Sequence, residues 1–134
     1  MTVSVEGPGV TVTLSDLDRS EGDLVVFSVR AEGAGLTASA RVETLHGDDF
    51  GLFVTGLERD FRGWPGERVW ISFRGDLELR AAHTGGVVEL AWTLRGPESV
   101  ADRARDWECV ARTFLTPGEE LRRFSADVTE FLAT

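Results

Sequence analysis

The chain has few of the residue types that catalysis, disulfide bonding or membrane insertion requires. Its 134 residues include one cysteine, two histidines and no lysine, asparagine, glutamine or tyrosine. Cys109 has no second cysteine with which to form an internal disulfide, and we therefore expect a cytoplasmic protein. No apolar run approaches the roughly 20 residues of a membrane-spanning helix. Residues 1–7 carry neither the basic nor the apolar region of a secretory signal.

The charge of the chain is strongly one-sided. Twenty-three acidic residues face 14 arginines, which leaves a formal net charge of −9 at pH 7. Nucleic acids and anionic membranes bind positive surfaces, so this balance argues against both as partners. It permits a basic protein partner, which an acidic surface attracts over about a Debye length. A plainer interpretation is that the acidity keeps a small domain soluble.

The sequence contains no pattern that is typical of a catalytic or metal site. His46 precedes a predicted helix and His83 borders a predicted turn, and both positions are typical of solvated side chains. Cys109 falls inside a predicted strand, where a buried structural thiol is more common than a nucleophile. Glu78 and Glu89 are predicted on the outer face of a hairpin, where carboxylates are normally solvated rather than paired for catalysis. We therefore predict no catalytic residue, no metal and no cofactor.

Alternating and helical patterns divide the chain into strands and two helices. Apolar residues at positions 50, 53, 54, 57 and 61 follow helical spacing, and so do those from Leu121 to Leu132. Short turns separate most of the strands, and short connections require antiparallel pairing because parallel neighbours need long crossovers. The predicted order is a loose hairpin with an acidic loop (1–23), strands at 24–32 and 36–45, a helix at 50–61, strands at 69–73, 77–83, 87–94 and 107–115, and a helix at 121–132.

This order of elements predicts a single α+β domain over residues 1–134. We expect one mainly antiparallel sheet of six to eight strands, with two helices packed on one face. The helical stripe predicts that Phe50 and Phe61 are buried on the same side of the first helix. Alternation within the strands likewise assigns Trp92 and Trp107 to the core.

Arginine and tryptophan gather at the end of the first predicted helix. One interpretation places Trp64 in the core, with Arg62 at the helix C-terminus or stacked on an indole. The other makes both residues exposed anchors of a protein-binding patch, because these two residue types dominate interface energetics. Acidic residues around such a patch would steer a basic partner. The candidate contact residues are Asp48, Asp49, Asp60, Arg62, Trp64 and Glu67.

Four short motifs connect the chain with a known group of domains. They are Asp60-Phe61-Arg62-Gly63-Trp64, Trp70-x-Ser72, Gly75-Asp76-Leu77-x-Leu79 and Thr93-Leu94-Arg95. Over about residues 22–132, the chain resembles a family of uncharacterised domains from GC-rich Gram-positive bacteria. It is more distantly similar to immunity proteins that are encoded beside wall-associated, contact-dependent toxins. Two positions depart from the family pattern, since Arg74 replaces an acidic residue and Val87 replaces a histidine.

The more distant resemblance implies a cytoplasmic protein that binds and blocks a cognate toxin. Together with the acidic charge and the scarcity of catalytic residues, it favours a non-catalytic protein-binding domain with a basic protein or toxin as its partner. One alternative is a small-ligand-binding domain, with an apolar pocket between sheet and helices that Trp70, Phe73 and Trp92 would line. Another is an interaction or structural protein, for example one that self-associates through an exposed sheet edge.

Overall fold

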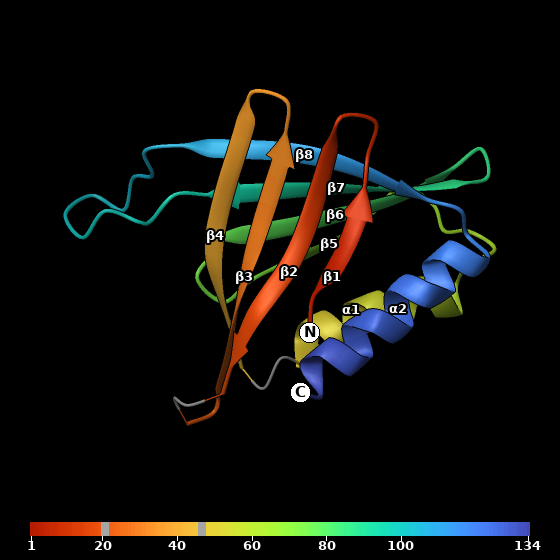
Figure 1. Cartoon of the computed structure of the whole chain (residues 1–134), viewed down its shortest axis with the longest axis horizontal. Helices are drawn as coiled ribbons and strands as arrows, with labels where there is room; N and C mark the ends of the chain where they lie inside the picture. Colours follow the sequence, from red (N-terminus) through yellow and green to blue (C-terminus); the bar gives the residue numbers. More distant parts are fainter. Residues whose placement is uncertain (20–21, 46–47) are drawn as a thin grey trace.

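Over the residues that the structure describes, the chain folds into two four-stranded antiparallel sheets and two helices (Figure 1). The computed structural model describes residues 1–19, 22–45 and 48–134, and of Asp48 it describes the backbone only. The first sheet has the strand order β1-β2-β3-β4 and the second β5-β6-β7-β8. The elements are β1 Val3–Glu6, β2 Val10–Asp18, β3 Leu24–Gly33, β4 Leu36–Leu45, α1 Asp48–Arg59, β5 Glu67–Ile71, β6 Leu77–Thr84, β7 Val87–Arg95, β8 Glu108–Leu115 and α2 Glu119–Leu132.

The predicted α+β fold with antiparallel strands and two helices is confirmed, but the predicted single sheet is wrong. Short turns determine which consecutive strands pair within each half of the chain. Between β4 and β5 the chain forms the 12-residue helix α1, so no short turn forces these two strands together. Two sheets can instead bury one apolar face each against the other, as in a sandwich. The alternation of apolar and polar side chains along the strands is compatible both with one sheet and with two sheets packed face to face.

The two helices join both sheets rather than cover one face of a single sheet. In Figure 1 the strands of the first sheet run steeply across those of the second, and α1 and α2 lie side by side. Phe27 of β3 contacts Phe50 of α1 and Phe131 of α2, with ring centroids 5.7 and 5.8 Å apart. Phe50 also packs on Trp70 of the second sheet, with centroids 4.8 Å apart. The hydrophobic core therefore lies where the inner faces of the sheets meet the helices.

Two aromatic residues that were predicted to be buried are exposed. Phe61 is 44 % exposed, because α1 ends at Arg59 and position 61 therefore lies outside the helical phase, in the following turn. Trp107 precedes β8, and its indole rests on Gly96, where an added Cβ atom would lie 2.6 Å from Trp107 Nε1. Trp92, by contrast, is fully buried as predicted.

The N-terminal hairpin contributes to the core and also contacts the second sheet. Val3, Val5 and Leu14 are buried on its inner side. The turn between β1 and β2 brings Gly7 against the backbone of β8, where a Cβ atom on Gly7 would lie 2.1 Å from the carbonyl oxygen of Arg112. A residue without a side chain is needed for such a close approach of two backbones.

We expect Gly7→Ala to lower the free energy of unfolding by about 1–3 kcal/mol, because the new methyl group must displace the backbone of the turn or of β8. Gly9→Ala is the matched control in the same turn, since a Cβ atom there meets no atom within 4 Å. For this control we expect a change of less than about 0.5 kcal/mol. Urea unfolding followed by tryptophan fluorescence measures both values. Equal effects of the two substitutions would contradict the close approach of the turn to β8.

Candidate functional site

We call the residues around Arg62 and Trp64, which include Asp60 and Glu67, the Arg/Trp corner. The tryptophan of this corner belongs to the core. Trp64 is 7 % exposed, and its Nε1–H donates a hydrogen bond to the carbonyl oxygen of Ala81 at 3.0 Å. Its ring packs edge-on against His83, with centroids 5.3 Å apart, and the guanidinium of Arg68 lies over it at 4.9 Å. His83 Nε2 in turn lies 2.8 Å from the carbonyl oxygen of Phe61. The structure thus favours the core interpretation of Trp64 over the exposed anchor.

The acidic residues of this corner are compensated by arginines. Asp60 lies 2.8 Å from Arg68 and 3.5 Å from Arg59. The hydrogen bond from Arg68 is the main reason that the pKa of Asp60 lies below its usual value. Glu67 faces Arg80 at 3.5 Å. Because each carboxylate has a cation beside it, the corner offers little negative field to a basic partner.

The predicted contact residues do not form one surface. Arg62 lies over a neighbouring phenylalanine ring, 5.7 Å from its centroid, in an exposed turn. Asp49 is exposed in the first turn of α1, whereas Asp60 follows the last turn, so about 17 Å along the helix axis separates them. The side chain of Asp48 and the whole of His46 lie outside the described residues.

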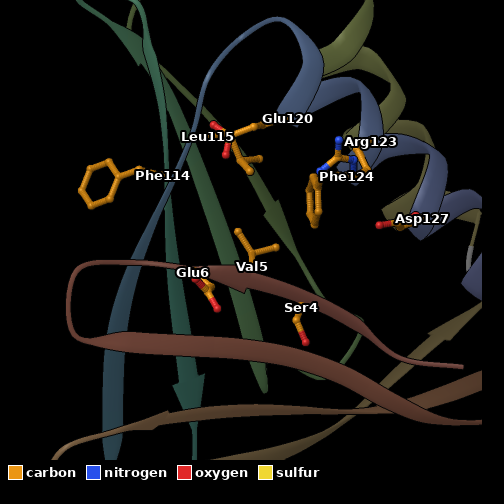
Figure 2. A pocket seen from close by; sticks show the side chains of 9 residues that line it. All are labelled: Ser4, Val5, Glu6, Phe114, Leu115, Glu120, Arg123, Phe124 and Asp127. Carbon is orange, nitrogen blue, oxygen red and sulfur yellow. The ribbon is translucent and has the colours of Figure 1, made fainter.

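A groove of about 220 Å³ opens where β1, the end of β8 and α2 meet (Figure 2). Its floor is apolar, because Val5, Leu115 and Phe124 point toward one another there and are all buried. Phe114 of β8 lies at one side, pointing away from this floor. The polar lining residues are Ser4, Glu6, Glu120, Arg123 and Asp127. We call this site the acidic groove.

Strand alternation and helical spacing position these side chains. Along β1, Val5 is buried whereas Ser4 and Glu6 are exposed. In α2, Phe124 belongs to the buried side and Asp127 is half-buried at its flank. The β1–β2 hairpin and α2 are thus both amphipathic, and the groove lies where β1 and α2 contact each other.

Glu120 is held at the beginning of α2 by a backbone hydrogen bond. The N–H of Thr116 donates to Glu120 Oε1 at 2.8 Å. This hydrogen bond is the largest of the effects that place the pKa of Glu120 below its usual value. The Glu120 carboxylate is therefore ionised at neutral pH.

The acidic groove carries an excess of negative charge. Three carboxylates, of Glu6, Glu120 and Asp127, share it with the single guanidinium of Arg123. Arg123 also faces Glu119 on the same helix, at 3.8 Å. Within the described part of the chain, neither Glu6 nor Asp127 forms an ion pair. Asp127 therefore offers an uncompensated carboxylate beside the apolar floor, whereas Glu6 borders the groove from the opposite side of β1 to Val5 (Figure 2).

The volume of the acidic groove and the placement of its side chains limit the kinds of ligand that it can bind. Its volume of about 220 Å³ is smaller than the roughly 300–1,000 Å³ that is typical of small-molecule sites. Among residues 1–19, 22–45 and 48–134, no three potential ligands from His, Cys, Asp and Glu converge closely enough to hold a metal ion. A long cationic side chain fits both constraints, because its aliphatic stem can cover the floor while its charged head reaches the carboxylates.

A second groove, of about 520 Å³, lies between the end of α1 and the beginning of α2. Phe61 and Pro117 line it, together with two arginines and two glutamates. Arg122 of this groove is paired with Glu119. Its two arginines balance its two glutamates, unlike the charges of the acidic groove. This second groove adjoins the Arg/Trp corner but has no net charge that would attract a charged partner.

Residues 3–134, nearly the whole chain, match a family of unknown function, DUF6228. The chain belongs to this family. The DUF6228 match confirms that an uncharacterised family covers the chain, whereas the likeness to immunity proteins stays a prediction. Neither a curated protein nor a solved structure matches this DUF6228 domain. In the part of the domain that the structure describes, neither helix has the length and apolar character that crossing a membrane requires.

Sequence reasoning missed the acidic groove of this DUF6228 domain for a simple reason. Glu6 and Asp127 lie at opposite ends of the chain, and only the packing of α2 against β1 brings them together. The local signal is weak but real, because each acid borders apolar positions: Glu6 follows Val5, and Asp127 lies between Phe124 and Val128. Acidic residues beside an apolar stripe are common on soluble proteins, so the pattern alone does not mark a site.

Proposed function

We propose that the protein is a non-catalytic protein-binding domain whose acidic groove receives a cationic side chain of a basic partner. The observation that carries this proposal is the composition of the groove. The carboxylates of Glu6 and Asp127, which form no ion pair among the described residues, border the groove, whose apolar floor is buried. Opposite charge steers the approach, and the net charge of −9 extends the attraction beyond the groove. Burial of the aliphatic stem on the floor then adds affinity.

We further propose that this partner is a toxin, which the domain neutralises in the cytoplasm by binding to it. Such a role needs no catalytic residue, and it fits the resemblance of the sequence to immunity proteins. An immunity protein must bind its toxin before the toxin acts. Electrostatic steering raises association rates well above those of neutral partners, so a large acidic excess serves this role.

The product of the adjacent gene is the first partner to test. With both proteins purified separately, the toxic activity of that product is measured as increasing amounts of this domain are added. The expected result is loss of toxic activity near a one-to-one ratio, with a stable complex on gel filtration. Toxicity that persists at an excess of this domain would rule out neutralisation, whether or not the two proteins bind.

Removal of the two free charges of the groove is expected to weaken that complex. For the double variant Glu6→Gln/Asp127→Asn we expect a dissociation constant raised about tenfold, which corresponds to about 1.4 kcal/mol. Most of the change at low salt is expected in the association rate. The matched control is Asp23→Asn/Glu130→Gln, which removes two exposed carboxylates outside the groove. Surface plasmon resonance at two salt concentrations measures both variants, and equal weakening would indicate that net charge acts rather than the groove.

The alternative function, binding of a small ligand between sheet and helices, has less support. Trp92 is fully buried, and its Nε1–H donates to Thr113 Oγ1 at 2.9 Å while its ring packs on Phe124. Trp70 packs on a phenylalanine of α1, whereas Phe73 is exposed in the turn after β5. Two of the three predicted lining residues thus fill the core, and the third lies at the surface.

A further inference from the structure

The two sheets differ in what their outer faces expose. On the first sheet, hydroxyl and charged residues such as Ser4, Thr13 and Arg30 occupy neighbouring outward positions. On the second sheet, four large apolar residues point outward and are between 38 and 54 % exposed. These residues are Val69, Ile71, Val110 and Phe114. The solvated face of an antiparallel sheet is normally polar. Here Val69 and Ile71 of β5 flank the face on one side and Val110 and Phe114 of β8 on the other, with β6 and β7 between the two pairs.

The charged side chains on this outer face of β5–β8 are all paired with one another. Strand register places four glutamates and three arginines there, a net charge of −1 on a chain whose net charge is −9. Glu78 lies at the centre, 3.1 Å from Arg95 and bonded to Arg80, and its side chain is only 8 % exposed. The other pairs are Arg80–Glu67, Arg95–Glu108 and Arg112–Glu89.

We propose that a second copy of this chain covers the outer face of β5–β8 and forms a twofold-symmetric dimer. Two acidic molecules repel each other over most of their surfaces, but this face carries little of the negative charge. Glutamates and arginines alternate across it, so a twofold rotation can set the arginines of one copy against the glutamates of the other. A basic partner would gain less here, because the carboxylates already have cations beside them.

The central ion pairs of this face reduce the desolvation free energy that a second copy must overcome to cover it. Desolvation is the main penalty when charged groups enter an interface. Glu78 is already withdrawn from water in the monomer, and the Arg95 side chain is 22 % exposed. The most central charges therefore lose little further hydration when a second copy packs on them.

The dimensions of the face predict a weak dimer. Four strands about 4.8 Å apart, each about eight residues long at about 3.3 Å per residue, give a projected area of about 500 Å². A standard protein–protein interface buries about 800 Å² per partner. We therefore expect the dimer to form at high protein concentration and to dissociate on dilution.

Gel filtration with light scattering, over a dilution series, tests the dimer without any partner protein. The wild type is expected to approach twice 14.7 kDa at the highest concentration and to fall to 14.7 kDa on dilution. Ile71→Lys and Val110→Lys are each expected to raise the dimer dissociation constant about tenfold or more, because each puts an unpaired ammonium group into the interface. Leu52→Lys makes the same change at an exposed site on α1 and is expected to leave the dimer intact. Circular dichroism confirms that each variant is folded.

Three results would overturn the proposal. The first is a wild-type mass of 14.7 kDa at every concentration. The second is dissociation by Leu52→Lys to the same extent as by the face variants. The third is a dimer that survives Ile71→Lys and Val110→Lys but is lost in Val69→Pro, because proline in the edge strand β5 would block backbone pairing with another strand. That pattern would indicate association through the sheet edge.

Discussion

Phe27→Ala is expected to lower the free energy of unfolding by about 3–5 kcal/mol, a large share of the roughly 5–15 kcal/mol that keeps a domain folded. Phe27 is fully buried in β3, and its ring contacts Phe50 of α1 at 5.7 Å and Phe131 of α2 at 5.8 Å. Truncation leaves a cavity where both helices meet the first sheet. Because protein cores are close-packed, neither helix can fill that cavity without disturbing its other contacts.

Phe73→Ala is the matched control for this prediction. It removes the same atoms from a side chain that is 65 % exposed in the turn after β5, and we expect a loss of less than about 0.5 kcal/mol. Denaturant titration followed by circular dichroism measures both variants. A loss below about 1 kcal/mol for Phe27→Ala would contradict the packing of the two helices against β3.

The strands could be predicted from the sequence because alternation and turn composition act locally. The segment 36–45, for example, is the strand β4, with Val42 buried and Arg41 exposed as its alternation predicts. The division into two sheets could not be predicted in this way. Trp70 shows why: its alternation indicates a buried side chain, but the covering element can be a helix or a facing sheet. That choice depends on how the whole chain buries its apolar surface.

The candidate site was harder to predict because residue type does not determine exposure. Arg62 and Trp64 are residues that anchor many interfaces, yet the indole of Trp64 is held by the carbonyl of Ala81 on the neighbouring strand β6. The register that places Ala81 there is a tertiary property. Glu6 and Asp127 have the opposite difficulty, since acids beside apolar positions are common on protein surfaces and only the packing of α2 beside β1 brings these two to one groove.

Strand alternation was misleading at Glu78 for a related reason. It correctly places this residue on the outer face of the second sheet, but the predicted solvated carboxylate is buried. Arg80 and Arg95, together with the neighbouring outward residues, cover it. Long arginine side chains can cover a sheet face in this way while their charged groups remain partly hydrated.

Glu78→Gln is expected to lower the free energy of unfolding by about 3 kcal/mol at pH 7. Loss of one partner from a buried ion pair costs about 3–5 kcal/mol, and the lower end applies because Arg95 keeps its pair with Glu108. Glutamine preserves the shape of the side chain but removes the charge that Arg80 and Arg95 share. The expected loss is therefore electrostatic rather than a packing effect.

The stability difference between the wild type and Glu78→Gln is expected to depend on pH. Burial acts to raise the pKa of Glu78, but hydrogen bonds and charges from Arg95 and Arg80 outweigh it and hold this pKa below its usual value of about 4.3. Because the folded-state pKa is lowered, the unfolded chain binds the proton first as the pH falls. The contribution of Glu78 is thus fully present above about pH 4.3 and is lost progressively below it.

Glu89→Gln separates the effect of burial from the effect of charge. Glu89 pairs with Arg112 at 3.4 Å on the same face, but 35 and 60 % of the two side chains remain exposed, so we expect a loss of less than about 1 kcal/mol. Urea unfolding of both variants and the wild type at pH 7 and at about pH 3.5 gives the comparison. Equal losses at pH 7 would mean that the burial of Glu78 adds nothing to its ion pairs. A gap between the wild type and Glu78→Gln that stays constant down to about pH 3.5 would mean that its carboxylate is not held ionised by the two arginines.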